Sequence, residues 1–231
     1  GKAQQGSIWY ESWTGLRWLR SHKTMFLVVM YVSVINFVIG SVAVLSIPYI
    51  LGRTESEATL GLIQGVMSVG GVVGAVIIGA WGGTRPRMHT IIPGLIVVGL
   101  ALILFGTSQN PILLAGTAFF FMLPLPMINT LFMSIMQAKT PPDIQGRVFA
   151  ALGQISMLLM PLSYLLAGPL ADNVFEAAIT SNAWSTFAPI VGETAGSGIG
   201  LMYMIAGSLV VVLSVAIYAS RDVRNFENDM P

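Results

Sequence analysis

The chain has 231 residues, of which 55% are hydrophobic and 9% are charged, and its formal net charge is +1. A soluble domain usually carries about 25% charged residues, so this composition excludes a water-soluble body and indicates that a lipid bilayer surrounds most of the chain. The small net charge excludes a basic nucleic-acid surface, and the lack of cysteine excludes disulfides.

The first segment, residues 1–23, is predicted to be a cytoplasmic interfacial linker. Its apolar residues recur at helical spacing: Trp9, Trp13, Leu16 and Leu19. With Arg17 and Lys23 beside them, they are typical of a helix that lies in the membrane interface. A Trp-rich flank that only anchors the first span is the alternative. Because the chain begins with Gly1, we expect it to be a fragment of a longer polypeptide, and a natural half that pairs is the alternative.

Six charge-free apolar runs follow, and each is predicted to be a transmembrane helix. They are residues 24–51, 58–81, 91–107, 112–136, 148–170 and 198–219. A span needs about 20 apolar residues, and backbone groups in hydrocarbon must find their partners within the segment. The predicted fold is therefore an all-α membrane protein, with a six-helix body over residues 24–220 and a cytoplasmic tail over 221–231.

The connections between the spans divide the basic residues unequally. Of the eleven Lys and Arg residues, ten lie on the side that holds both termini, and Arg53 lies on the other. Basic residues stay on the cytoplasmic side during insertion. We therefore predict that both termini are cytoplasmic, together with Arg85 and Arg87 between the second and third spans.

Glycines line the second span. Gly61 and Gly65 are four residues apart, as are Gly70 and Gly74. Small residues at this spacing let helices approach closely in a membrane. Tight packing against another helix is the preferred interpretation, and a smooth face along which helices move is the compatible alternative.

Two prolines, Pro124 and Pro126, stand in the middle of the fourth span in the stretch FMLPLPMIN. Each removes a backbone hydrogen bond, so the helix should loosen there. A broken helix at the midplane of a transporter points to its substrate site.

A helix start is predicted before the fifth span, in the stretch TPPDIQGR. Thr140 would cap this helix, Pro141 would occupy its first position, and Asp143 would complete a capping box. Arg147 would then lie at the cytoplasmic mouth of the fifth span.

The polar side chains inside the spans are few. Four amides fall on the first, second, fourth and fifth spans: Asn36, Gln64, Asn129 and Gln154. Most polar residues in spans bond a neighbouring helix, so helix packing is the alternative role for each. We predict that they line a substrate cavity.

An enzyme is not expected. The spans contain no Asp or Glu, and the only histidines, His22 and His89, lie at the inner edge. No nucleophile therefore has a base within hydrogen-bond reach inside the membrane. Neither a cofactor nor a metal site is expected, because the chain offers no cysteine and no histidine cluster.

Five stretches resemble a known family in content and order: WTGLRWLRSHK, GAWGGTRPRMH, MQAKTPPDIQGRVFAALGQ, PLSYLLAGPLADNVFE and GSGIGLMYMIAG. They are similar to the C-terminal half of major facilitator superfamily transporters, in particular the macrolide-efflux and enterobactin-exporter group. The resemblance implies two inverted three-helix repeats that form half of a twelve-helix transporter. It also implies that the first, second, fourth and fifth spans line the central cavity.

The resemblance extends to a cytoplasmic loop motif between the second and third spans. Gly79 matches the glycine of that motif, but Gly83 stands where the family has an acid, and Thr84 where it has an arginine. The acid-based gating latch is therefore not expected in this half. Arg85 and Arg87 are interpreted as topology signals, and a contact on the cytoplasmic side is the alternative role for Arg87.

The function that these features predict is secondary active export. The chain would be the C-terminal half of a bacterial inner-membrane exporter that moves bulky apolar small molecules, a drug or a siderophore, by alternating access. Its partners would be the lipid bilayer, the missing N-terminal six-helix half and the substrate. A membrane subunit or remnant that only packs against a partner is the alternative.

Overall fold

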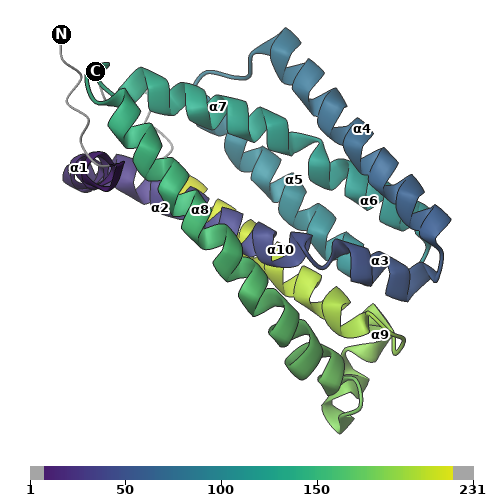
Figure 1. Cartoon of the computed structure of the whole chain (residues 1–231). Coiled ribbons are helices and arrows are strands. Elements are labelled where there is room, and N and C mark those ends of the chain that lie inside the picture. The colour runs from purple at the N-terminus through teal and green to yellow at the C-terminus, as the bar shows by residue number, and fades with distance from the viewer. Residues whose placement is uncertain (1–7, 221–231) are drawn as a thin grey trace.

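A computed structural model describes residues 8–220, and side chains from Thr14 onward except that of Ala183. Within this part the chain is helical and has six helices that are long and apolar enough to cross a membrane (Figure 1). They are Lys23–Thr54, Glu57–Trp81, Met88–Thr107, Pro111–Lys139, Gln145–Glu176 and Ser197–Ala219. Each predicted run lies inside one of them, so the six-span fold is confirmed. The predicted tail, residues 221–231, lies outside the described residues.

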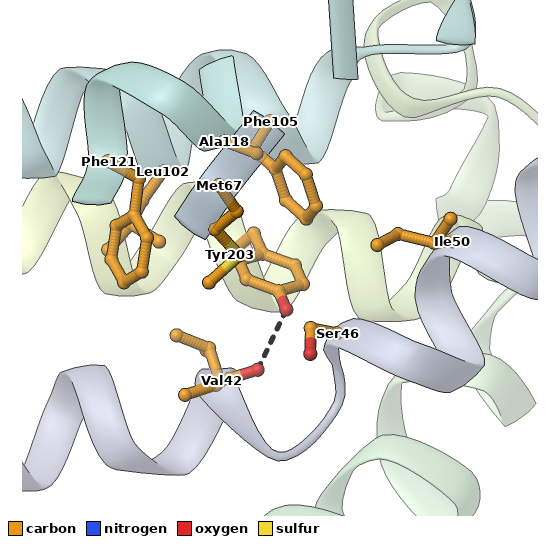
Figure 2. A pocket seen from close by; sticks show the side chains of 10 residues that line it. Val42, Ser46, Ile50, Met67, Leu102, Phe105, Ala118, Phe121 and Tyr203 are labelled. Atoms are coloured by element: carbon orange, nitrogen blue, oxygen red, sulfur yellow. Dashed lines mark hydrogen bonds between the residues drawn. The ribbon is translucent and has the colours of Figure 1, made fainter. Parts of the chain in front are cut away.

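The first span is interrupted, which the sequence prediction did not include. It consists of α2 (Lys23–Ala43) and α3 (Ser46–Thr54). Pro48 explains the interruption, because it has no N–H for the carbonyl of Val44 and its ring crowds that carbonyl. The hydroxyl of Tyr203, on the last span, donates a 2.8 Å hydrogen bond to the Val42 carbonyl at the end of α2 (Figure 2).

The fourth span is also interrupted, as its two prolines predict. It consists of α6 (Pro111–Met122) and α7 (Pro124–Lys139), with Leu123 between them. Pro126 cannot donate to the carbonyl of Met122, so the regular bonding of α6 ends there. The first spans of both predicted three-helix repeats are therefore divided into two helices.

The other elements complete the bundle. They are α1 (Ile8–Ser21), α4 (Glu57–Trp81), α5 (Met88–Thr107), α8 (Gln145–Leu170), the π-helix η1 (Ala171–Glu176), the 3-10 helix η2 (Asn182–Thr186), α9 (Ala188–Val191) and α10 (Ser197–Ala219). The fifth span was expected to end at Leu170, but η1 continues it to Glu176. Pro169 removes one regular helical bond just before the wider π turns begin.

The helix start predicted before the fifth span is wrong. α8 begins at Gln145 without a side-chain cap. Pro142 has no N–H, so it removes one of the groups that a Thr140 cap could bond. The backbone N–H of Gln145 donates instead to the Pro141 carbonyl at 3.1 Å, and residues 141–144 form a turn.

The interfacial segment contains a helix separate from the first span. In Figure 1, α1 is seen nearly end-on while α2 crosses the picture, so the two helices meet at a steep angle. Leu19 is fully buried, and Gly15 lies directly on the backbone of Arg147 at the start of α8. The predicted roles of Trp9 and Trp13 concern side chains outside the described part.

The centre of the bundle is the pair formed by α5 and α10, which make the most extensive contact between any two helices described here. Glycines face each other across this contact at two levels, Gly99 with Gly207 and Gly106 with Gly200. A Cβ on Gly99 would lie 2.8 Å from the Gly207 carbonyl oxygen. The two backbones therefore touch, as small residues permit in membrane helices.

Only one of the two predicted glycine pairs of α4 packs as expected. A Cβ on Gly70 would lie 2.6 Å from the carbonyl oxygen of Phe119, and Gly74 lies against Leu123. A Cβ on Gly61 or Gly65 would meet no described atom within 4 Å. The expectation for this second pair is not met within the described chain.

The alternating spans bring the basic residues of the described part to one end, with the exception of Arg53. Arg17 and Arg20 lie on α1, and the turns before α5 and α8 lie at the same end (Figure 1). Arg53 lies at the opposite end, on α3. The structure therefore agrees with the asymmetry on which the predicted orientation rests.

Labelling of introduced cysteines tests this orientation. Asp143 and Asn182 are both exposed and lie at opposite ends of the bundle. In intact cells, we expect Asn182→Cys to react with a membrane-impermeant thiol reagent and Asp143→Cys to react only after the cells are opened. The native chain, which has no cysteine, is the blank. The reverse pattern would contradict cytoplasmic termini.

Candidate substrate cavity

A cavity of about 680 Å³ lies within the bundle. Its walls come mainly from α2, α7 and α8, with Gly71 of α4, Leu95 of α5 and Met122 of α6 completing them. The two interrupted spans and the fifth span thus supply most of the surface. The volume falls in the range that holds a drug-sized ligand.

Two of the four predicted amides line this cavity together. Asn36 lies on α2 and Asn129 on α7, and both side chains are exposed. Neither amide makes a hydrogen bond within the described part of the chain. An amide in this state keeps its two N–H donors and its carbonyl acceptor for a ligand.

The other two predicted amides do not line the cavity. Gln64 lies on α4 seven residues before Gly71, which places it on nearly the same helix face about 10 Å further along. Gln154 lies on α8 directly after the cavity residue Gly153, about 100° around the helix. Both are half-buried. The family resemblance implies that four spans line the cavity. One of them, α4, contributes only Gly71 to this wall.

Two serines in the wall are not among the predicted site residues. The hydroxyl of Ser33 donates to the Val29 carbonyl at 2.8 Å, and that of Ser156 donates to the Leu152 carbonyl at 3.1 Å. Their donors are therefore used within their own helices. Helical spacing could have found Ser33, because it lies three residues before Asn36 and thus on the same face.

The rest of the wall is apolar and adaptable. Phe132 and Met133 come from α7, Met122 from α6, and Phe149 from α8. Flexible, polarisable methionine side chains fit varied apolar surfaces. Mostly apolar walls with a few placed polar groups are typical of small-molecule sites.

The predicted cytoplasmic loop residues lie apart from the cavity. Gly79 is in the last turns of α4, and Gly83 follows that helix in a left-handed conformation with φ of 80°. A Cβ on Gly83 would lie 2.9 Å from the Leu131 side chain. A carboxylate side chain would therefore be strained at this position, in agreement with the missing latch acid.

The three arginines predicted for the cytoplasmic loop motif differ in their surroundings. Arg85 and Arg147 are exposed, at the turn before α5 and in the first turn of α8. Arg87 is half-buried and occupies the N-cap position of α5. None of them lines the cavity.

A second cavity lies beside the interruption of the first span. It is a small apolar cavity of about 30 Å³, lined by Val42, Ile50, Phe105 and Tyr203 among others (Figure 2). That volume suits about one water molecule. It is too small for an organic substrate, so the larger cavity is the candidate site.

Metal ligands do not cluster in the described residues. No group of three or more His, Cys, Asp or Glu side chains that could hold a metal ion is found among them.

Sequence comparison places the chain beside bacterial efflux pumps. Over 138 aligned residues it is 29% identical to multidrug efflux pump Tap of Mycolicibacterium fortuitum. This alignment covers 54% of this chain and 30% of that protein. Over 225 aligned residues it is 20% identical to macrolide efflux protein A of Streptococcus pyogenes. This alignment covers 92% of this chain and 48% of that protein. No family model and no solved structure matches the chain.

These relatives confirm the resemblance to drug exporters that the motifs indicate. Both are named as transport proteins, in agreement with a chain that is not an enzyme. The chain spans about half the length of macrolide efflux protein A and under a third of Tap in the matched parts. Together with the six apolar helices, they support a transport role for a multi-pass membrane protein.

Proposed function

We propose that the chain acts as the C-terminal half of a secondary active exporter of bulky apolar small molecules in the bacterial inner membrane. The cavity of about 680 Å³ with two unbonded amides supports this proposal most directly. A chain that only packed against a partner would have no need for such a wall. The names of the two relatives favour a drug, with a macrolide as the first candidate.

Alternating access would use the two interrupted spans. Both contribute to the cavity wall, α2 with Asn36 and α7 with Asn129. A helix that is already divided can change the angle between its two parts without breaking further backbone bonds. Discontinuous helices that carry a binding site are a recurring device of transporters.

A second six-helix half would close the cavity. The spans other than α5 and α10 have only 17–28% of their apolar windows buried inside the chain. On α4, the surface around Gly61 and Gly65 is open, and small residues there would allow a close helix contact. Asn36 and Asn129 would then face an enclosed site rather than lipid, where unbonded amides are costly.

The proton-coupling group of such an exporter would come from the other half. Carboxylates and histidines serve as proton relays inside membranes. Within the six described spans, Asp and Glu lie only near the ends, as at Glu57 and Glu176. This half would therefore supply the cavity wall and the other half the titrating group.

Ligand binding by the two amides tests the proposal. We expect the purified chain in lipid nanodiscs to bind a fluorescent macrolide, measured by fluorescence polarisation. Asn36→Leu and Asn129→Leu should each weaken binding about tenfold, which corresponds to one lost hydrogen bond of about 1.4 kcal/mol.

Gln154→Leu is the matched control, because it makes a similar polar-to-apolar change on α8 outside the cavity. Equal binding by all three variants would contradict the assignment of the site. Absence of binding by the unchanged chain would contradict a substrate wall in this half. Thermal unfolding of each variant separates lost binding from lost folding.

A further inference from the structure

A groove of about 550 Å³ lies between α1, α2 and α8, and neither Asn36 nor Asn129 lines it. Leu16 and Arg20 of α1 border one end of it. Along its length, its walls are apolar side chains of α2 and α8: Phe26, Met30, Val34, Phe37, Ile155, Leu159 and Leu162. The groove thus combines one charged end with a long apolar remainder.

We propose that this groove binds an anionic phospholipid of the cytoplasmic leaflet, with its phosphate at Arg20 and an acyl chain along α2. The inference is independent of what the exporter carries. It rests on the length of the groove, on the position of the charged Arg20, and on the lack of a free hydrogen-bond donor in the rest of its described wall.

The length of the groove matches one leaflet. Phe26 and Phe37 are eleven residues apart on α2, which corresponds to about 16 Å along the helix. The hydrocarbon core of a bilayer is about 30 Å thick, so one leaflet contributes about 15 Å. An acyl chain that starts at the α1 end would therefore reach the end of the groove near the midplane.

The positive charge of Arg20 lies at the end of the groove where the phosphate of a bound lipid would be. Arg20 is exposed, and no acidic partner for it is found in the described chain. Arg17 and Lys23, three residues before and after it, are exposed as well. A cluster of cations beside an apolar groove on the cytoplasmic side is a common setting for anionic headgroups.

The interior of the groove offers no competing polar ligand site. Its other polar side chain is Ser33, whose hydroxyl donates to the Val29 carbonyl at 2.8 Å. A ligand with polar groups along its length would lose hydrogen bonds to water there without replacing them. A lipid needs polar contacts only at its headgroup, so it fits this distribution better than a peptide segment or a polar drug.

Ser33 also belongs to the wall of the 680 Å³ cavity. The groove and the cavity therefore meet at one level of α2. An acyl chain in the groove would therefore border the cavity at the level of Ser33.

Retention of lipids by the purified chain tests the proposal. The chain is reconstituted with equal amounts of phosphatidylglycerol and phosphatidylethanolamine, extracted in mild detergent and examined by native mass spectrometry. We expect phosphatidylglycerol to be retained preferentially. Arg20→Gln should lower this preference about fivefold, and Leu159→Trp should lower the retained amount by filling the groove.

Two matched variants serve as controls. Arg85→Gln removes an exposed cation at the same end of the bundle, away from the groove, and Leu104→Trp adds the same bulk at an exposed position of α5. Both should retain phosphatidylglycerol as the unchanged chain does. Equal retention of the two lipids, or equal effects of Arg20→Gln and Arg85→Gln, would overturn the proposal. Arg20 is exposed, so its variant remains informative if Leu159→Trp does not fold.

Discussion

Replacing Gly207 by valine is expected to separate α5 from α10 and to lose most of the folded protein. A Cβ at this position lies against the carbonyl of Gly99, and 2.8 Å from Ile103. Because backbone atoms of both residues stand in the way, the helices must move apart. Overpacking of this kind costs about 3 kcal/mol, a large share of a typical stability of about 5–15 kcal/mol.

Thermal unfolding in detergent, followed by size-exclusion chromatography, measures this loss. Gly116→Val is the control, because Gly116 is also helical and a Cβ there would meet no described atom within 4 Å. The control should unfold at nearly the temperature of the unchanged chain. Equal losses from the two variants would mean that the contact between α5 and α10 does not hold the bundle together.

Replacing Glu176 by alanine is expected to loosen the start of α10. The carboxylate accepts hydrogen bonds from the backbone N–H of Ile199 at 2.9 Å and of Gly196 at 3.3 Å. These are among the amides at a helix N-terminus that no carbonyl of the helix can bond, and a negative charge there also suits the helix dipole. Loss of both bonds should cost about 2 kcal/mol.

Hydrogen–deuterium exchange localises this effect, since amides in residues 196–200 should exchange faster while those of α5 change little. Asp172→Ala is the control, because Asp172 is an exposed acid on the same π-helix. Glu176→Gln keeps one acceptor and should fall between the two. Faster exchange in both alanine variants alike would point to the π-helix rather than to the cap.

Much of the fold could be predicted because the bilayer imposes a simple rule on sequence. Each run of about 20 residues without charge became a span, and the prolines at 124 and 126 correctly marked the division of the fourth. The division of the first span was missed although Pro48 was visible. A single proline near the end of a span is common and does not by itself predict a division. The hydrogen bond from the Tyr203 hydroxyl of α10 to the Val42 carbonyl marks the position of the division in the structure.

The candidate cavity was only partly predictable. The four amides were found from composition alone, but which face of a helix points inward depends on its rotation in the bundle. That rotation is set by contacts such as Gly70 on Phe119, between helices far apart in sequence. Asn36 and Asn129 consequently share a wall, whereas Gln64 and Gln154 do not.

The pairing of α5 with α10 has a consequence for how the chain is made. About 90 residues separate Thr107 from Ser197, and α10 itself must follow before the two can pair. At about 5–20 residues per second, the ribosome needs roughly 5–20 s for this stretch. During that time, the third span stands in the bilayer without its principal neighbour, and the glycine-lined face that later meets α10 is covered by lipid or by the insertion machinery. Assembly of the bundle therefore depends on α10, so a ribosome that stalls before α10 leaves the spans from α2 to η1 without their central contact.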